Sequence, residues 1–422
     1  MAPVAVTPYV PRLLDATLEA LLAALPAVMV VGPRGCGKTT SARRLVRSVV
    51  RLDREREAAP FRDDPDDLLR SLEPPVLLDE WQLVPGILAA VKRAVDDHVD
   101  GASYVLTGSV RAELLEASWA ATGRVVRLIQ WGLSERELAG RADAPSFFDV
   151  LFDGDIDDLR MPAEPPTLRD YVDLALRGTY PDVALQPSAS IRRRWLAAYV
   201  DQLVIRDASR ADEQRDPVRL RRYLVAVASN TAGVVEHKTI FDAAGVSRMT
   251  GVAYDSVLDL LFVAAQVPAW HSNRLNRLTR SPKRYLTDAA LVGPLLSVDA
   301  RAVLRDGDLL GRVVDTFVLS QLRPEAEASD RSILFSHLRL DRGEHEVDLI
   351  AEAADGTVVA IEIKSAAAPT LDDAVHLRWL RDRLGDQFRA GVLLHTGPRP
   401  FRLDERIHAL PIATIWGPRR AV

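Results

Sequence analysis

The fold of this chain is decided by one stretch, Val30-Val31-Gly32-Pro33-Arg34-Gly35-Cys36-Gly37-Lys38-Thr39-Thr40. It fits the phosphate-binding pattern G-x-x-x-x-G-K-[ST] at every position. The apolar run at residues 28–31 is typical of a buried parallel strand, and residues 41–46 continue as a helix. Strand, glycine-rich loop and helix therefore follow one another in the order of a nucleotide-binding α/β domain.

Each part of this loop has an expected task. The glycines let backbone N–H groups approach an anion closely. Lys38 is expected to bridge the β- and γ-phosphates, and the Thr39 hydroxyl to ligate Mg²⁺. The expected phosphate contacts are Gly32, Pro33, Arg34, Gly35, Cys36, Gly37, Lys38, Thr39 and Thr40. The stretch thus predicts a nucleotide with Mg²⁺ as its cofactors.

Length and composition set limits on the rest of the chain. At 422 residues with 48% hydrophobic content, two or three packed domains are expected. The formal net charge is −5, so any nucleic-acid contact must be a local patch. The single cysteine, Cys36, excludes an intramolecular disulfide and a cysteine-rich metal site. Without a signal-peptide pattern or a membrane-length apolar run, we expect a soluble cytoplasmic protein.

Two further strands complete the expected site. A short apolar run, residues 76–78, ends in Asp79 and Glu80, which are expected to serve the Mg²⁺ shell and the attacking water. A third strand, residues 103–106, is followed by Ser109, whose hydroxyl is expected beside the γ-phosphate, or else marks an ordinary turn. Arg124 is interpreted either as an arginine finger, acting in its own or a neighbouring subunit, or as a surface arginine.

The middle of the chain reads as mostly helical. A linker is expected at residues 153–166, and residues 191–228 carry apolar positions at helical spacing. Residues 237–262 have the spacing of a helix-turn-helix. A basic stretch follows, in which phosphate contacts are expected from Arg274, Arg277, Arg280, Lys283 and Arg284. A solvated hairpin or a protein-docking surface remains the alternative for this stretch.

A hairpin near the C-terminus collects acidic side chains. Residues two apart in a strand share a face, so Glu346 pairs with Asp348, and Glu362 with Lys364. With Asp315 from a preceding helix, they are expected to form a cluster that suits Mg²⁺. The alternative is a scaffold hairpin with its charges on a solvent-facing surface.

The ordered set of motifs resembles the prokaryotic AAA-type ATPases that carry a C-terminal domain of unknown function. It consists of the phosphate loop, Leu78-Asp79-Glu80-Trp81-Gln82-Leu83-Val84-Pro85, Leu106-Thr107-Gly108-Ser109, Gly123-Arg124 and Leu133-Ser134-Glu135-Arg136-Glu137. The resemblance implies ATP as the nucleotide. It also implies an α/β fold: an AAA-type parallel-sheet domain at 1–160, a helical and winged-helix-like region at 167–300, and a PD-(D/E)xK nuclease-like domain at 305–422. Asp348, Glu362 and Lys364 match the nuclease pattern, and Asp315 stands where such folds often have Glu.

Two functions remain open from the sequence. In the first, ATP hydrolysis is coupled to the binding or processing of nucleic acid, with DNA the expected partner, by a C-terminal nuclease-like domain. In the second, the protein is an ATP-dependent switch in an assembly, for instance a defence or toxin-linked regulator, whose C-terminal domains dock a protein partner and cut nothing. The substrate, the oligomeric state and the pathway stay open.

Overall fold

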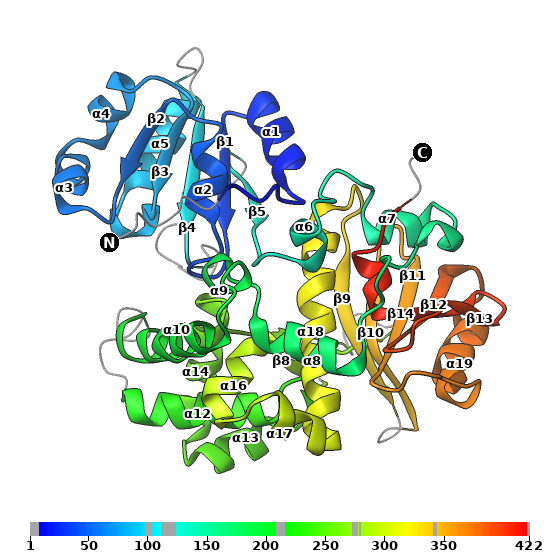
Figure 1. The fold of residues 1–422 in the computed structure, drawn as a ribbon. Helices are drawn as coiled ribbons and strands as arrows, with labels where there is room; N and C mark the ends of the chain where they lie inside the picture. Colours follow the sequence, from blue (N-terminus) through cyan, green and yellow to red (C-terminus); the bar gives the residue numbers. More distant parts are fainter. Residues whose placement is uncertain are drawn as a thin grey trace. The chain divides into compact units, whose positions relative to one another are not determined.

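The computed structural model describes residues 8–97, 103–110, 124–207, 216–271, 277, 280–340 and 344–419. The chain divides into two compact units, one up to Asp143 and one from Ala144 onward. Figure 1 follows the chain through the elements of both units. Among the described residues, no helix is long and apolar enough to cross a membrane.

The first unit contains a five-stranded parallel sheet, as the phosphate loop predicts. Its strands are β1 (Ala27–Val31), β2 (Ser48–Arg51), β3 (Val76–Asp79), β4 (Tyr104–Gly108) and β5 (Val126–Ile129), in the order β2-β3-β4-β1-β5. The central strands β1, β3 and β4 are buried along their whole length, because their residues are almost all apolar. This order places the carboxyl ends of β3, β4 and β1 side by side at one edge.

Helices and short turns complete this unit. They are α1 (Asp15–Ala24), α2 (Lys38–Arg43), α3 (Glu55–Asp63), α4 (Pro65–Ser71), the 3₁₀ turn η1 (Trp81–Leu83), α5 (Ile87–Asp96) and α6 (Glu135–Leu138). Leu14 and Leu18 pack with Val28 and Val30 of β1, so the first helix supports the nucleotide strand as its apolar spacing predicts. Helix α2 begins directly after the phosphate loop.

The second unit opens with helices and a small antiparallel sheet. The helices are α7 (Phe147–Phe152), α8 (Leu168–Arg177), α9 (Pro181–Ala184), α10 (Ala189–Gln202), α12 (Pro217–Ser229), α13 (His237–Ala244) and α14 (Arg248–Leu260). The strands are β6 (Gly233–Val234), β7 (Ala264–Val267) and β8 (Lys283–Leu286), in the order β6-β8-β7. Helix α13 ends at Gly245, whose φ of 67° turns the chain into α14.

A six-stranded mixed sheet forms the rest of the second unit. Helices α16 (Val292–Leu296), α17 (Ala300–Arg305) and α18 (Gly307–Ala328) lead into it, and α19 (Val375–Leu384) lies between two of its strands in sequence. The strands are β9 (Leu334–Leu340), β10 (His345–Glu352), β11 (Val358–Lys364), β12 (Phe388–His395), β13 (Phe401–Asp404) and β14 (Ile407–Pro411). Their order is β13-β14-β12-β11-β10-β9, with β10 antiparallel and β12 parallel to β11.

The compact units differ from the expected ranges 1–160, 167–300 and 305–422. Helix α7 belongs to the second unit, because Ser146 Oγ and the Phe147 N–H both donate to Glu325 of α18, at 2.6 Å each. The regions expected at 167–300 and 305–422 form one compact unit, in which Lys283 of β8 bonds to Asp315 of α18. These buried contacts tie α7 to later elements, so the boundary falls after Asp143 and not within the loop-like residues 153–166.

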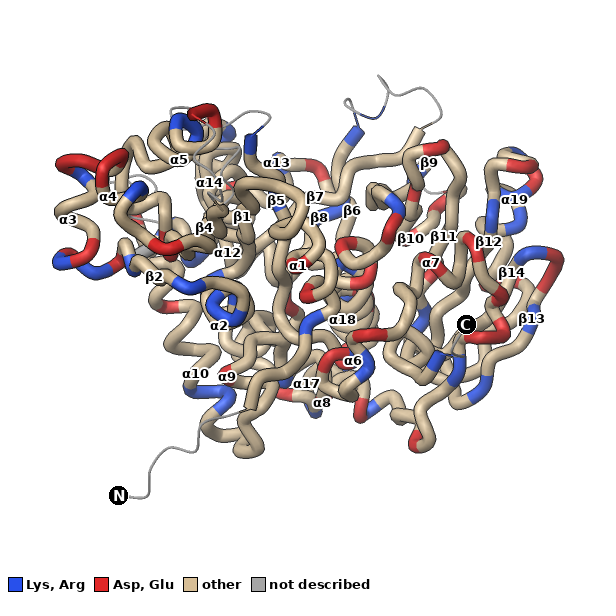
Figure 2. The backbone as a smooth tube through the Cα atoms, turned by 90° about the horizontal axis from the view of Figure 1, so that it is seen from above, with Lys and Arg blue, Asp and Glu red and all other residues tan. Residues whose placement is uncertain are grey.

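Charged residues of both signs are interspersed along the described elements of each unit (Figure 2). Helices α3 and α4, for instance, together carry three arginines and five acidic residues. This mixing agrees with the small net charge of the whole chain.

Candidate functional site

The phosphate loop joins β1 to α2 through a backbone that requires glycine. Gly35 and Gly37 have φ values of 77° and 100°, which residues with a Cβ rarely adopt. A Cβ on Gly32 would lie 2.0 Å from the carbonyl oxygen of Gln130. The loop therefore runs close to the segment after β5, and this close approach explains a glycine at position 32.

Lys38 is folded back over this loop. Its side chain is buried, and Nζ donates to the carbonyl oxygens of Gly32 and Pro33 at 3.0 and 2.8 Å. The ammonium group thus has no carboxylate partner within salt-bridge distance in the described part of the chain. A phosphate group would supply the negative charge that this buried cation lacks.

Asp79 and Thr39 meet at the end of the sheet. Thr39 Oγ1 donates to Asp79 Oδ1 at 2.7 Å, and Thr107 Oγ1 donates to the same oxygen at 2.6 Å. Asp79 is only 3% exposed. The hydroxyl and carboxylate oxygens predicted to serve Mg²⁺ are therefore adjacent, and they belong to the class of oxygen ligands that this cation prefers.

Glu80 is held by two side chains beyond β3. Its φ is 58°, a left-handed conformation that turns the chain sharply out of the strand. Its Oε2 accepts hydrogen bonds from Gln82 Nε2 at 2.5 Å and from Ser109 Oγ at 3.1 Å. Ser109 therefore lies beside Glu80, because β3 and β4 are adjacent strands, and its expected place beside the γ-phosphate stays a prediction. The contact from Gln82 was missed by sequence reasoning, because it depends on the turn at Glu80.

Arg12 contacts the phosphate loop, and the sequence did not predict this contact. Its guanidinium forms an ion pair with Glu137 at 3.0 Å and donates to the carbonyl oxygen of Cys36 at 2.9 Å. It also donates to the carbonyl oxygens of Trp131 and Gly132. Both members of the ion pair are almost fully buried. Nothing in the local sequence pattern distinguishes this arginine from a surface residue at the start of a helix.

Arg124 does not contact the described residues of the candidate nucleotide site in this structure. Its Nε pairs with Asp96 at the end of α5, and Asp96 also accepts from Lys92 at 2.7 Å. These two contacts, with Lys92 first, lower the pKa of Asp96 to about 2. The role of Arg124 as a finger stays a prediction, and its neighbour Gly123 lies outside the described residues.

The second unit assembles the expected carboxylate cluster around a lysine. Lys283 Nζ lies 2.6 Å from Asp315 Oδ2 and 2.8 Å from Asp348 Oδ1, and the lysine side chain is 4% exposed. Lys364 Nζ bonds to Glu362 Oε1 at 2.8 Å. Three elements, α18, β10 and β11, thus supply carboxylates to one place, and β8 supplies a cation that the expected cluster did not include.

The charges of this cluster are strongly perturbed. Burial, reinforced by Asp348, raises the pKa of Glu362 to about 8. Burial raises the pKa of Asp315 to about 6, although the charge of Lys283 opposes this shift. For Asp348 the effect of burial is outweighed by the charge and the hydrogen bond of Lys283, so its pKa is lowered. The cluster is therefore a buried, tightly coupled set of ionisable groups.

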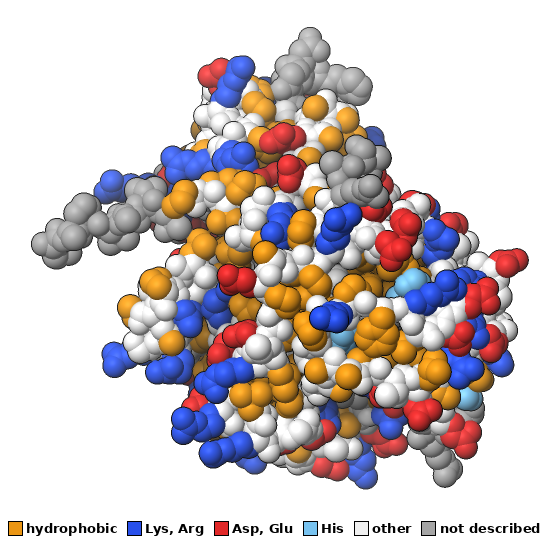
Figure 3. Space-filling model, turned by 45° about the vertical axis from the view of Figure 1, so that its right-hand side comes forward, with side chains coloured by type: hydrophobic (Ala, Val, Ile, Leu, Met, Phe, Trp, Pro, Cys, Tyr) orange, Lys and Arg blue, Asp and Glu red, His pale blue; other side chains and the backbone are white. Residues whose placement is uncertain are grey.

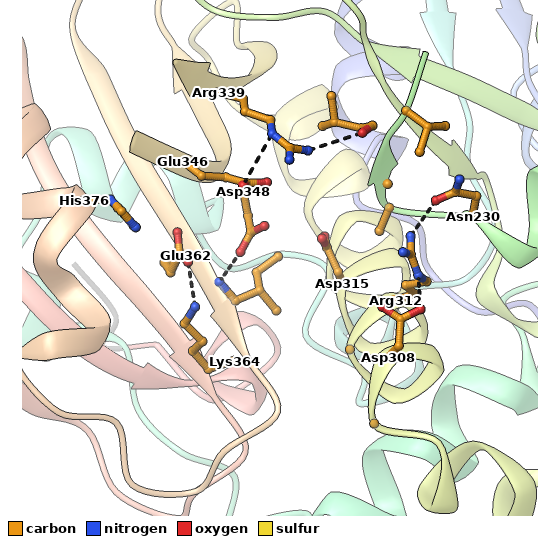
Figure 4. A pocket seen from close by; sticks show the side chains of 17 residues that line it. Asn230, Asp308, Arg312, Asp315, Arg339, Glu346, Asp348, Glu362, Lys364 and His376 are labelled. Atoms are coloured by element: carbon orange, nitrogen blue, oxygen red, sulfur yellow. Dashed lines mark hydrogen bonds and ion pairs between the residues drawn. The ribbon is translucent and has the colours of Figure 1, made fainter. Parts of the chain in front are cut away.

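A cavity of about 560 Å³ opens beside the cluster. Glu362, Lys364, Glu346 and His376 line one side, and Asp308, Arg312 and Asn230 line the other (Figure 4). Glu346 forms an ion pair with Arg339 at 3.8 Å and does not pair with Lys283. Among the residues that the structure describes, no three His, Cys, Asp or Glu side chains are arranged to hold a metal ion.

The basic stretch does not form the expected row of free cations. Lys283 and Arg284 lie in strand β8 and are 3% and 2% exposed, which corrects the expectation that they contact phosphates. Arg284 donates to Asp255 of α14 at 2.9 Å, and Arg277 forms an ion pair with Glu352 at 2.6 Å. Carboxylates from other elements neutralise these cations, and without them the buried charges of Lys283 and Arg284 would be strongly destabilising.

Of the other two arginines in the basic stretch, the structure describes Arg280 but not Arg274. Arg280 is exposed and donates to the carbonyl oxygen of Arg339 at 3.0 Å. Arg274 lies outside the described residues. On the face drawn in Figure 3, charged side chains of both signs alternate with hydrophobic ones.

The chain is similar to two uncharacterized mycobacterial proteins, Mb2031c of Mycobacterium bovis and Rv2008c of Mycobacterium tuberculosis. Each is 26% identical over 401 residues, which cover 94% of this chain and 82% of the relative. Residues 168–302 and 310–415 match two family models described as domains of unknown function, DUF8612 and DUF4143. Residues 25–139 match the model of an AAA domain, and this segment contains the phosphate loop and Asp79. The N-terminal part of the chain is therefore an AAA-type P-loop domain.

Proposed function

We propose that the first unit binds ATP with Mg²⁺ and hydrolyses it. The observation that carries this proposal is the convergence of Lys38, Thr39, Asp79 and Glu80 at the carboxyl ends of β1 and β3, which flank β4. The backbone of residues 32–40 would hold the phosphates, with Lys38 neutralising them. Thr39 and Asp79 would hold Mg²⁺, which draws negative charge from the phosphate oxygens. Glu80, oriented by Ser109, would accept a proton from the attacking water.

The direct test is phosphate release by the purified chain at increasing Mg²⁺ and ATP concentrations. Lys38→Ala is expected to lose both ATP binding and hydrolysis. Glu80→Gln is expected to keep binding while hydrolysis falls by roughly 100- to 10,000-fold. Lys92→Ala is the matched control, because this lysine pairs with Asp96 on α5 and should leave the rate unchanged. Equal rates in wild type and Lys38→Ala would overturn the proposal.

We propose that the second unit acts in an ATP-dependent switch that docks a protein partner. Two observations support this role over cleavage. Lys283 and Arg284 are buried in ion pairs and do not face solvent. Helix α14 instead exposes apolar side chains, with Met249 83% and Val252 48% exposed. A helix surface of this kind suits a protein contact better than a phosphate backbone.

Nucleic-acid processing is the second candidate. It is supported by the arrangement of α13, the Gly245 turn and α14 beside the three-stranded sheet, which suits a winged-helix-like module. The grouping of Asp348, Glu362 and Lys364 on adjacent strands agrees with the PD-(D/E)xK pattern. Cleavage would then be expected at this cluster, with DNA as the partner.

One set of reactions separates the two candidates. ATP hydrolysis is measured with and without linear DNA, circular DNA and RNA, and the nucleic acids are examined on gels. A rate indifferent to nucleic acid, with intact gels, supports the switch. Stimulated hydrolysis, with cleavage that is lost in Lys364→Ala but kept in Lys92→Ala, would establish the nuclease-coupled enzyme instead.

A further inference from the structure

We propose that Lys283 is a built-in cation that occupies the place of a metal ion in the carboxylate cluster of the second unit. Its ammonium group lies between Asp315 and Asp348 at 2.6 and 2.8 Å and is almost completely buried. The inference concerns only the second unit, so it does not depend on ATP hydrolysis in the first.

The two aspartates have a complete set of donors from the protein. Asp315 Oδ1 accepts from the Tyr285 hydroxyl at 3.0 Å, while its Oδ2 accepts from Lys283. Asp348 Oδ2 accepts from the Ile363 N–H at 3.0 Å, while its Oδ1 accepts from Lys283. All four oxygens are therefore bonded without a metal ion. A divalent cation could reach them only by displacing the ammonium group.

Glu362 marks the side on which a metal would complete its coordination. The residue is 5% exposed and lines the cavity, and its Oε1 bonds to Lys364. Its Oε2 is buried and has no hydrogen-bond partner among the described residues. The three carboxylates are not arranged as a metal site while the ammonium group separates them. If that group left, we expect this oxygen and those of Asp315 and Asp348 to close around Mn²⁺ or Mg²⁺, which prefer hard oxygen ligands.

The cation is supplied by a different part of the sequence from the carboxylates. Lys283 lies within residues 168–302, whereas Asp315, Asp348 and Glu362 lie within residues 310–415. Strand β8 carries Tyr285 as well, so the same strand delivers both donors to Asp315. We infer that these contacts join the small sheet to α18 and β10 and keep the cluster independent of metal.

The test measures Mn²⁺ binding by electron paramagnetic resonance in the nucleotide-free full chain. Every protein carries Asp79→Asn, which removes a carboxylate of the first unit from the measurement. The background protein is expected to bind no Mn²⁺ in the second unit. Lys283→Met is expected to gain one bound Mn²⁺ per chain, and Glu362→Gln in the same protein to lose it. Lys364→Met is the matched control and should gain none, because within the described part of the chain its ammonium bonds to Glu362 alone and not to the two aspartates.

A second variant covers the case in which Lys283→Met does not fold. Lys283→Met combined with Asp315→Asn removes one charge of each sign, so the buried cluster keeps its net charge. This double variant is expected to fold and to bind Mn²⁺ through Asp348 and Glu362, more weakly than three carboxylates would. The proposal is overturned if either folded variant binds no Mn²⁺, or if the background protein already binds one ion that Asp348→Asn removes. An equal gain in Lys364→Met would also overturn it.

Discussion

Thr39 donates its hydroxyl hydrogen bond to Asp79 Oδ1 across 2.7 Å, although forty positions separate the two residues in the chain. The contact joins the start of α2 to the end of β3. Because parallel neighbours β3, β4 and β1 end at the same edge, the hydroxyl from one motif and the carboxylate from another meet where a Mg²⁺ ion would lie. The two halves of the proposed ATP site are thus already assembled by the sheet.

The charge of Asp79 is expected to be essential. Asp79→Asn keeps the hydrogen-bond geometry with Thr39 but removes the negative charge that would hold Mg²⁺, so hydrolysis should fall by at least about 100-fold. Phosphate release over a range of Mg²⁺ concentrations checks this. Asp53→Asn is the control, because it makes the same substitution at a side chain of this unit that is 40% exposed. A rate within a factor of two of wild type would remove Asp79 from the site.

Gln82 is expected to restrain Glu80. Its amide donates to the carboxylate at 2.5 Å and holds it toward Ser109. Gln82→Ala leaves Glu80 free to reach the attacking water, so the basal rate of ATP hydrolysis should rise by roughly 2- to 10-fold, a small part of what a positioned base contributes. Gln82→Glu places a like charge beside Glu80 and tests the geometry separately. A fall in the rate of Gln82→Ala would mean that the amide positions Glu80 productively.

Gly32 is expected to tolerate no side chain. Gly32→Ala places a Cβ 2.0 Å from the Gln130 carbonyl oxygen, so the loop must move, at a cost of about 3 kcal/mol or more of unfolding free energy. Gly86→Ala is the matched control: its φ is 87°, but its Cβ would meet nothing within 4 Å. Only the backbone strain, roughly 1–2 kcal/mol, should remain there. Chemical denaturation compares the two, and equal costs would contradict the close approach.

The buried pair of Arg12 and Glu137 is expected to stabilise the first unit strongly. Arg12→Met leaves the buried carboxylate of Glu137 without its cation, although backbone N–H groups still bond to it, and this should cost about 3–5 kcal/mol. Arg47→Met removes an ion pair with Glu73 that is largely exposed and should cost about 1 kcal/mol or less. Denaturant titration of both variants checks this, and similar costs would show that burial of the Arg12 pair adds nothing.

Stability of the second unit should fall in acid partly through His337. Burial in β9, helped by the nearby Lys283 and Arg339, lowers the pKa of His337 to about 4. In the unfolded chain this histidine takes up its proton near pH 6.5. The contribution of the neutral histidine to the free energy of unfolding is therefore complete above pH 6.5 and is lost as the pH falls from 6.5 to 4. The loss should total roughly 3 kcal/mol.

The measurement is the free energy of unfolding at pH 7 and pH 5 for wild type and His337→Gln. Because Gln does not titrate, the variant should lose less stability than wild type over this interval. Comparing the two proteins cancels the titration of the carboxylates they share. An identical pH dependence would show that His337 is readily protonated in the folded chain.

The nucleotide site was largely predictable because it depends on local motifs and on strand ends. The glycine pattern places residues 32–40, and an apolar run followed by Asp79 and Glu80 identifies the neighbouring strand. The contact between Ser109 and Glu80 was not predicted, because it depends on β3 and β4 being adjacent in the sheet. Gln82 escaped prediction because its contact requires the left-handed turn at Glu80, and Arg12 because its partners are more than 100 positions away or in the loop.

The sequence alone determined the parallel AAA-type sheet and its phosphate loop, since each motif carries its own geometry. It also placed Glu362 and Lys364 on one face of a strand, because side chains two apart point the same way. Only the tertiary structure decided that Lys283 is buried and not exposed. A basic stretch is expected to face water unless distant carboxylates neutralise it, and here Asp315 and Asp348, 32 and 65 positions away, do so in a buried cluster.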